Sequence, residues 1–296
     1  MKVARYSIND ETKIGIIHGE TIIELDNWPS LQTDNRLGVM SVLQADPSII
    51  EAIKASIASL PSVKMSDVTL LAPIPKPEKF LGLGFAFKSH IKEVLNKFPD
   101  IKLPQHQVWF NKQVSCITGP HAPIYMPPVS DQLDYEVELA VVIGKKCRYV
   151  KAENVTDVIA GYMICNDASI RDWQLRAPTA MIGKSFDTHG PTGPWVTSAN
   201  SFPLDHDFNL RTWVNGELRQ DGHTSDWAYS LGQMIEELTT AFTLEPGDIL
   251  ATGTPCGVGA ACTPAKYLKI GDVVRMEIAG LGSIENTVVA EPVYTY

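Results

Sequence analysis

Short β-like runs dominate the chain after residue 70 and restrict it to a fold built mainly of strands. Glycine- and proline-rich turns separate the runs, which occupy residues 106–110, 135–143, 193–198, 208–214, 248–252, 273–279 and 284–290. Helical patterns in the same region are few: 89–98, about 167–175, and 228–241. Short strands that recur with so few helices between them predict a sandwich or a barrel-like roll.

A proline-rich segment separates this region from a smaller N-terminal one. The segment "LLAPIPKPEKF" is a stiff connector and marks the best domain boundary, near residue 70. Before it, "ARYSINDETKIGIIHGETIIEL" alternates β-type runs with turns at "NDE" and "HGE", and a helical pattern between Leu37 and Leu60 is ended or interrupted by Pro47. We therefore predict a small α+β domain at 1–70 and a mainly β domain at 71–296.

Charge and cysteine usage exclude several classes of protein. The net charge of −9 argues against nucleic acid as a partner, because phosphate binding needs a concentrated basic patch. No stretch is apolar for long enough to span a membrane. The first residues, "MKVARYSINDETK", lack the apolar core of a secretory signal, and five widely spaced cysteines without a C-x-x-C pair indicate reduced thiols. We therefore expect a cytoplasmic protein that binds no zinc.

Three glycine-rich stretches imitate nucleotide-binding motifs without completing them. "GKS" at 183–185 has Pro178 where a phosphate-binding loop starts with glycine, and "GLGFAF" at 82–87 has Phe87 at the third glycine position. "TGTPCGVGA" at 252–260 has no lysine, and no G-x-S-x-G elbow is present. The sequence thus predicts neither a nucleotide site nor a serine nucleophile.

Two glutamates in an apolar run, "LDYEVELAVVIG" at 133–144, are the first chemical signal. Residues two apart in a strand share a face, so Glu136 and Glu138 lie side by side. A half-solvated strand would explain them, but Leu139 to Ile143 are continuously apolar, as in a strand covered on both faces. Two buried carboxylates repel each other unless a cation lies between them, which points to a bound metal.

A third carboxylate follows in "MICNDASIRDWQ". If Asn166 or Asp167 starts a short helix, then Asp167, Arg171 and Gln174 lie on one helical face. A capping aspartate with an Asp–Arg pair would explain the same pattern. Combined with the glutamate pair, however, Asp167 completes a set of oxygen ligands, which suits a hard divalent cation.

Five motifs in order resemble the fumarylacetoacetate hydrolase superfamily, whose members include acylpyruvate hydrolases. They are "LDYEVELAVVIG", "CNDASIRDWQ", "GKSFDTHGPTGPWV", "VNGELRQDGHTSDW" and "LEPGDILATGTPCGVG". The resemblance implies the mixed β-sandwich or roll of that superfamily and a homodimer. It makes Glu136, Glu138 and Asp167 the ligands of one Mg²⁺ or Mn²⁺, with Ca²⁺ as a further option.

The resemblance also implies the residues around the metal. Lys184 and Gln174 would contact substrate oxygens, and Arg171 and Thr254 would line the pocket. Without the resemblance, Lys184 would be interpreted as a solvated lysine in a glycine-flanked turn.

A second pair of candidate residues lies in "FLGLGFAFKSHIKEVLNKFPD". Ser89 can cap a helix that Pro99 ends, and His90 and Glu93 then lie one turn apart on its polar flank. An exposed amphipathic helix would show the same spacing. The resemblance implies a mobile lid at 85–107, in which Glu93 orients His90 as a general base for water.

The chain departs from the superfamily pattern at the lid hinge and at expected pocket walls. Gly84 and Phe85 stand where relatives have asparagine and tyrosine, Gln113 replaces a proline, and His189 and His223 replace an aromatic residue and an asparagine. The metal ligands are intact, so the metal site is the firmer prediction and substrate identity the weaker.

We accordingly predict a metal-dependent hydrolase that cleaves a C–C bond of a 2,4-dioxo acid to a 2-oxo acid and a carboxylic acid. His90, Glu93 and Lys184 are the predicted catalytic residues, and the substrate is a small anion. A decarboxylase of oxaloacetate-like acids, or a dehydratase or tautomerase of related oxo acids, needs the same metal. A binding module that holds an oxo acid without turnover is the alternative outside the enzymes.

Overall fold

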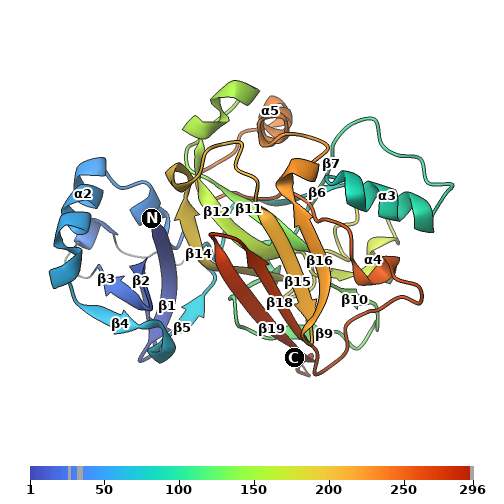
Figure 1. Cartoon of the computed structure of the whole chain (residues 1–296), viewed down its shortest axis with the longest axis horizontal. Coiled ribbons are helices and arrows are strands. Elements are labelled where there is room, and N and C mark those ends of the chain that lie inside the picture. Colours follow the sequence, from blue (N-terminus) through green and yellow to red (C-terminus); the bar gives the residue numbers. More distant parts are fainter. Residues whose placement is uncertain (26–27, 32–35, 294–296) are drawn as a thin grey trace.

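The computed structural model describes residues 1–25, 28–31 and 36–293. Its N-terminal elements form a small part on the left of Figure 1, and the rest of the chain forms a larger, strand-rich body. Strands dominate the described residues, with short helices at the periphery. The predicted fold class, mainly β with a small N-terminal α+β part, is confirmed.

One mixed sheet runs through both parts of the molecule. Along its path lie β4 (Ser62–Lys64), β3 (Thr21–Glu24), β2 (Glu11–His18), β1 (Lys2–Ile8), β14 (Gly190–Ser198), β12 (Ile159–Asn166), β11 (Val137–Ile143), β17 (Ile249–Ala251), β6 (Phe80–Gly84) and β7 (Val108–Asn111). In addition, β5 (Thr69–Leu71) pairs with β1, and β8 (Ile117–Thr118) pairs with β14. Because β1 pairs with β14, the N-terminal strands extend the sheet of the larger part. The division near residue 70 stays a prediction.

Two further sheets complete the larger part. One follows the order β16 (Glu217–His223), β15 (Asn209–Val214), β18 (Val273–Ile278), β19 (Gly282–Ala290) and β9 (Ile124–Met126). The other is a two-stranded ribbon of β10 (Leu133–Asp134) and β13 (Ser169–Ile170).

Turn chemistry sets the hairpins. Asn9 and Asp10 connect β1 to β2 and both have positive φ, of 50° and 62°. Asn215 and Gly216 connect β15 to β16 in the same way, with φ of 51° and 80°. Such pairs match the right-handed twist of the flanking strands. The turns predicted at "NDE" and "HGE" are confirmed: they connect β1 to β2 and β2 to β3.

The helices are short and lie outside the sheets. They are α1 (Met40–Leu43), α2 (Pro47–Ser56), α3 (Lys88–Lys97), α4 (Arg171–Gln174) and α5 (Leu231–Ala241). The predicted interruption of the helical pattern at Pro47 is confirmed, because Pro47 is the first residue of a separate helix, α2. The Asp46 side chain caps α2 by accepting from the Ser48 amide. Ser230 and Gln233 form a capping box at the start of α5.

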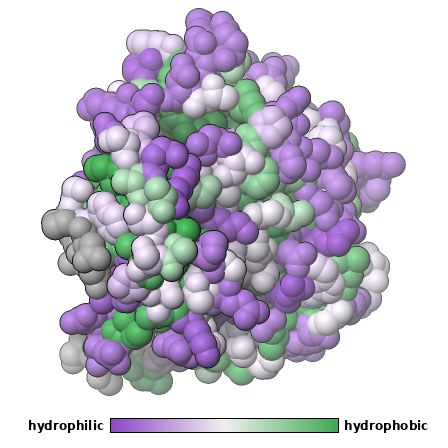
Figure 2. All heavy atoms as spheres, turned by 60° about the vertical axis from the view of Figure 1, so that its left-hand side comes forward, coloured by the Kyte–Doolittle hydropathy of each residue, from purple (hydrophilic) through white to green (hydrophobic). Residues whose placement is uncertain are grey.

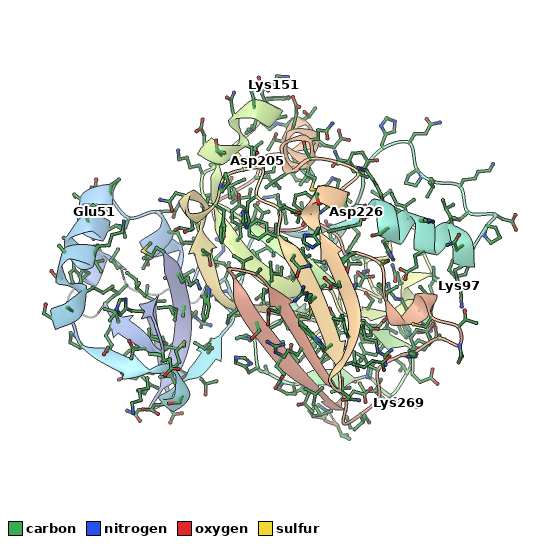
Figure 3. The ribbon with its side chains drawn as sticks, viewed as in Figure 1. Glu51, Lys97, Lys151, Asp205, Asp226 and Lys269 are labelled. Atoms are coloured by element: carbon green, nitrogen blue, oxygen red, sulfur yellow. The ribbon has the colours of Figure 1, made fainter. Side chains whose placement is uncertain are left out.

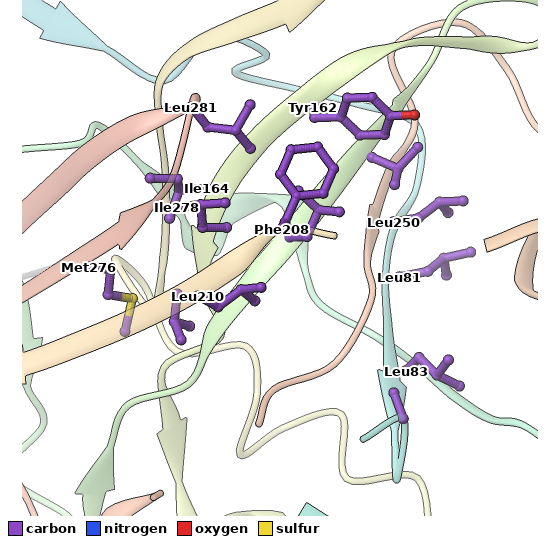
Figure 4. Packing of buried hydrophobic residues seen from close by; sticks show 14 of the residues in the cluster. Leu81, Leu83, Tyr162, Ile164, Phe208, Leu210, Leu250, Met276, Ile278 and Leu281 are labelled. Atoms are coloured by element: carbon purple, nitrogen blue, oxygen red, sulfur yellow. The ribbon is translucent and has the colours of Figure 1, made fainter. Parts of the chain in front are cut away.

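Apolar residues cover β11 on both faces. Leu139, Val141 and Ile143 pack into a core between the long sheet and the β15–β18 sheet, part of which Figure 4 shows. Ala140 and Val142 join a second core with residues of α1, α2 and β2. Every residue of β11 is buried, which confirms the prediction that this strand is covered on both faces.

The surface gives no sign of a large apolar face on the side that Figure 2 shows. Hydrophilic residues predominate there, and the apolar residues form separate small patches. None of the helices in the described ranges combines the length and apolar character needed to span a bilayer. All five cysteines are free thiols, three of them buried.

Candidate active site

Three buried carboxylates converge where β11 and β12 pair. Glu136 immediately precedes β11, Glu138 lies within it, and Asp167 immediately follows β12. The Asp167 amide donates to the Glu136 carbonyl at 2.9 Å, which continues the pairing of the two strands. Each residue offers a carboxylate oxygen, and these oxygens lie within 4.8 Å of one another. The structure thus brings together the three predicted ligands.

Cationic side chains surround two of the three carboxylates. Lys184 Nζ lies 2.6 Å from Glu136 Oε2 and 2.6 Å from Asp167 Oδ2. Lys112 Nζ donates to Asp167 Oδ1 at 2.6 Å, and Arg171 Nη1 lies 2.7 Å from Glu136 Oε1. Although burial would raise it, the pKa of Glu136 is lowered by Lys184 and Arg171.

The third carboxylate has no such compensation. Glu138 Oε2 accepts a hydrogen bond from the Gly253 amide at 2.7 Å, and no cationic side chain within the described ranges forms a salt bridge with it. Burial, and then the nearby Asp167 and Glu136, raise the pKa of Glu138 well above its ordinary value. The negative charge of ionised Glu138 is therefore unfavourable in this cluster, and the folded protein favours the protonated form.

The residues fit a hard divalent cation. Their donor atoms are all carboxylate oxygens, the ligands that Mg²⁺ and Mn²⁺ prefer. A cation among them would also neutralise the charge that leaves Glu138 uncompensated. Lys184, which already joins Glu136 and Asp167, would lie next to such an ion.

The predicted His90–Glu93 pair is formed on α3. His90 Nδ1 lies 2.8 Å from Glu93 Oε2, and Glu93 Oε1 accepts from the Gly257 amide at 2.8 Å. The two side chains are only 15% and 19% exposed, so this is not the exposed helix of the alternative interpretation. Gly257 lies four residues after Gly253, whose amide donates to Glu138 Oε2, so the pair contacts the same loop as the carboxylate cluster.

Contacts at both ends hold α3 against the larger part of the molecule. Asp226 Oδ2 accepts from the Ser89 amide at 2.8 Å, and Lys97 Nζ donates to the Cys262 carbonyl at 3.0 Å. Figure 3 shows Asp226 beside the first turn of α3 and Lys97 near its last. The prediction that Ser89 caps this helix is wrong: α3 starts at Lys88, and Asp226 supplies the acceptor.

The predicted substrate-binding residues are largely engaged within the protein. Arg171 Nε donates to Asp134 Oδ2 at 2.8 Å, and Nη1 donates to Gln174 Oε1 at 2.9 Å. Arg171 Nη2 is buried and has no partner among the described residues. The Thr254 hydroxyl donates to the Val137 carbonyl and accepts from Gln220 Nε2. A substrate contact for Arg171, Gln174 and Thr254 stays a prediction.

The prediction that a helix starts at Asn166 or Asp167 is wrong. Asp167 continues the strand pairing of β12, residues 169–170 form β13, and α4 begins only at Arg171. Arg171 and Gln174 share a helical turn, whereas Asp167 lies outside it, immediately after β12. Arg171 pairs with Asp134 and Glu136.

Lys112 and Asp134 are buried site residues that sequence reasoning missed. Lys112 is 2% exposed and donates to Asp167 and to the Lys184 carbonyl; Asp167 raises its pKa although burial opposes this. Its one signal is the superfamily pattern from which Gln113 departs, because the matching stretch "FNKQ" at 110–113 contains this lysine. Asp134 does have a signal, because acidic residues at 134, 136 and 138 continue one strand alternation.

Comparison with known proteins gives the family. A family model described as "Fumarylacetoacetate (FAA) hydrolase C-terminal" matches residues 79–289, and the Rv2993c-like N-terminal model matches residues 1–73. The chain belongs to the fumarylacetoacetate hydrolase family. The resemblance inferred from the five motifs is confirmed.

Two relatives from the family have named activities. Oxaloacetate tautomerase YisK of Bacillus subtilis (strain 168) is 41% identical over 227 residues, which cover 76% of this chain and 74% of that protein. Mitochondrial oxaloacetate tautomerase FAHD2A of Homo sapiens is 36% identical over 276 residues, 88% of this chain and 86% of that protein.

Solved structures of the family superpose over nearly the whole chain. Maleylpyruvate hydrolase from Sphingobium sp. SYK-6, in complex with manganese(II) and pyruvate, gives a TM-score of 0.82 at 28% identity and covers 99% of this chain and 100% of that one. Fumarylacetoacetate hydrolase from Exiguobacterium antarcticum gives 0.82 at 33% identity, with 98% and 100% covered.

The two histidines that depart from the family pattern lie in different surroundings. His189 is fully buried, stacks on Phe186 and donates from Nε2 to the Tyr125 carbonyl at 2.7 Å. Burial lowers its pKa to about 4. His223 lies on the exposed β16 and contacts Asp207, so it does not line a pocket with the carboxylates.

Proposed function

We propose that this family member is a divalent-metal-dependent tautomerase of a 2-oxo dicarboxylic acid, with oxaloacetate as its substrate. The observation that carries the proposal is that the His90–Glu93 pair contacts the same loop as Glu138, one of three buried carboxylates that fit a hard cation. The two tautomerases that share 41% and 36% of their aligned residues with this chain support the choice of reaction.

Interconversion of the oxo and enol forms moves a proton and breaks no C–C bond. The C3–H bond breaks, its electron pair becomes the C2–C3 double bond, and the 2-oxo oxygen takes up a proton. The cation held by Glu136, Glu138 and Asp167 supplies Lewis-acid polarisation of the 2-oxo group when it is bound.

The residues of the chain move the proton and orient the acid. Glu93 accepts from Nδ1 of His90, so Nε2 is the nitrogen that takes the proton from C3. Lys184 has three N–H donors and uses two of them on Glu136 and Asp167, which leaves one for a substrate oxygen. The buried and unpartnered Arg171 Nη2 is a further donor for a carboxylate.

Hydrolysis of a 2,4-dioxo acid, the reaction predicted from the sequence, is the second candidate. The same His90 nitrogen would then deprotonate a water that attacks the distal carbonyl. The similarity to maleylpyruvate hydrolase favours it. The His90–Glu93 pair suits hydrolysis as well as tautomerisation and argues only against decarboxylation, which needs no attacking water. The homodimer and the cytoplasmic location stay predictions.

Three assays on one preparation separate these reactions. Protein treated with EDTA and reloaded with Mg²⁺ or Mn²⁺ is given oxaloacetate, and enol absorbance and pyruvate release are followed separately. A 2,4-dioxo acid such as acetylpyruvate is given in parallel, and the loss of its enol absorbance is followed. We expect metal-dependent acceleration of oxaloacetate tautomerisation above the other two rates. Faster cleavage of acetylpyruvate would replace the proposal with hydrolysis, and faster pyruvate release would replace it with decarboxylation.

A further inference from the structure

A fourth buried carboxylate, Asp134, lies beside the cluster and contacts two separate segments. Its Oδ1 accepts from the amides of Tyr135 at 2.9 Å and Gly259 at 2.7 Å. Its Oδ2 accepts from the Ala260 amide at 2.9 Å and from Arg171 Nε at 2.8 Å. Every one of these four partners is an N–H donor, and the side chain is fully buried.

One of the two segments is α4, which contacts the carboxylate cluster. Arg171, the first residue of α4, uses Nε for Asp134 and Nη1 for Glu136 Oε1 at 2.7 Å. Because the guanidinium is planar and rigid, fixing Nε also fixes the direction in which Nη1 approaches Glu136.

The other segment is the loop that contacts α3. Gly259 and Ala260 begin the short 3₁₀ helix η8 (Gly259–Ala261), two residues after Gly257, whose amide donates to Glu93. The loop lies so close to Asp134 that a Cβ at Gly259 would come within 2.6 Å of Oδ1. Asp134 therefore determines where the Gly257 amide is presented to α3.

We propose that Asp134 is a positioning residue that couples the docked His90–Glu93 pair to the arginine beside the carboxylate cluster. It acts through the Gly259 and Ala260 amides on one side and through Arg171 on the other. With Asp134 in place, His90 is held at one position relative to Glu136. Loss of the carboxylate charge allows α3 and the cluster to shift independently.

A buried aspartate of purely structural role is present for comparison. Asp248 is also fully buried and accepts from the Lys79 amide at 2.8 Å, Lys79 Nζ at 3.0 Å and the Glu245 amide at 2.8 Å. It precedes β17, whereas the site lies after the other end of that strand. The variant Asp248→Asn is therefore a control matched in burial and hydrogen bonding.

The first test compares Asp134→Asn with Asp248→Asn. Asparagine places an NH₂ group against donors that now meet Oδ2. We expect Asp134→Asn to lower kcat by about 10²-fold with a smaller change in KM, since a shift of about 1 Å in a reacting group has that effect. Amide hydrogen exchange across residues 88–97 should become faster in Asp134→Asn and stay unchanged in Asp248→Asn.

The kinetic result rests on the proposed function, whereas the exchange result does not. If the wild type turns over neither oxaloacetate nor the 2,4-dioxo acid, the proposed function fails and exchange alone decides the role of Asp134. Unchanged exchange across 88–97 in a folded Asp134→Asn protein would overturn it. If that variant does not fold, Ala260→Pro removes one donor to Oδ2 and leaves the carboxylate in place. Faster exchange at α3 supports the role and unchanged exchange overturns it.

A double-mutant cycle with Glu93→Gln tests whether Asp134 acts through Glu93 on α3. If Asp134 positions the amide that holds Glu93, the double variant should lose little more kcat than the more damaged single variant. Losses that multiply would show that the two residues act independently and would overturn the coupling.

Discussion

Replacing Glu138 with glutamine is expected to stabilise the metal-free protein and to remove its stabilisation by metal. Glu138 is 1% exposed and meets Glu136 and Asp167 with one hydrogen bond, from the Gly253 amide, to compensate. Glutamine keeps an acceptor for that amide, carries no charge and offers NH₂ donors to the neighbouring carboxylates. The variant therefore removes a repulsion that is otherwise relieved by a bound cation or by protonation of Glu138.

The raised pKa of Glu138 sets how much the free energy of unfolding can increase in Glu138→Gln. Burial and then the neighbouring carboxylates raise the pKa of Glu138 well above 4.5, so the folded protein binds this proton more tightly than the unfolded chain. The resulting stability is fully present below pH 4.5 and is lost as pH rises toward the folded pKa, by about 1.4 kcal/mol per pH unit. At pH 7 the loss reaches at most about 3.4 kcal/mol, which is the largest advantage that Glu138→Gln can have.

With metal bound, the wild type should become more stable than Glu138→Gln. An ion present at about 100 times its dissociation constant adds about 2.7 kcal/mol to the wild type. With an unfolding entropy of about 2.1 cal/mol/K per residue, this corresponds to about 4 °C in the unfolding midpoint of a 296-residue chain. The variant lacks one of the three charged ligands and should keep little of this increase.

Calorimetric midpoints in EDTA and in excess Mn²⁺, at pH 5 and pH 7, measure both effects. Asp248→Asn is the control, because its carboxylate is paired with Lys79 at 3.0 Å and its loss should destabilise the protein with and without metal. The reasoning is refuted if Glu138→Gln is destabilised in EDTA as Asp248→Asn is, or if Mn²⁺ raises its midpoint as much as that of the wild type.

Three further predictions concern residues around the site. His90→Ala should lower kcat by about 10²-fold or more and leave Mn²⁺ affinity unchanged; an unaltered kcat would remove His90 from the mechanism. Lys112→Met removes the buried partner of Asp167 and should lower the free energy of unfolding by about 3–5 kcal/mol in urea titrations, whereas the exposed control Lys145→Met should change it by less than about 0.5 kcal/mol. Equal effects of the two lysine variants would contradict the structure. Burial lowers the pKa of His189 from 6.5 to about 4, so its contribution to stability is fully present above pH 6.5 and is lost as pH falls toward 4, by roughly 3 kcal/mol. His189→Phe should flatten the stability profile over that interval, and an unchanged profile would show that another group is responsible.

The parts of the site that sequence predicted are those with local periodicity. Strand alternation places Glu136 and Glu138 on one face, and helical spacing brings His90 to Glu93, because both patterns are complete within a few residues. Asp167 meets the glutamates only through the pairing of β11 with β12; its conjunction with the glutamate pair suggested it as a ligand, and the resemblance implied the same. Periodicity alone placed Asp167 on a helix, because its spacing to Arg171 is that of a helical turn. In the structure the Asp167 amide instead donates to the Glu136 carbonyl and continues the strand pairing.

The parts that sequence missed depend on contacts between distant segments. Lys112 contacts residues 55 and 72 positions away, and apart from the superfamily pattern nothing beside it in the chain distinguishes a buried lysine from an exposed one. The pairing of β1 with β14 likewise joins the two parts of the main sheet across nearly two hundred residues. The proline-rich segment near residue 70 indicates a boundary in the chain and does not reveal that the sheet continues past it.

The most direct test of the account is a Mn²⁺ titration of EDTA-treated protein, with bound ion measured by electron paramagnetic resonance and oxaloacetate tautomerisation measured in the same samples. We predict that the rate rises in proportion to bound Mn²⁺ and saturates at one ion per chain, and that both signals are lost in Glu138→Gln. A full rate in EDTA, or ions that bind to this cluster without any change in rate, would contradict the claim that the three carboxylates hold the cation on which the reaction depends.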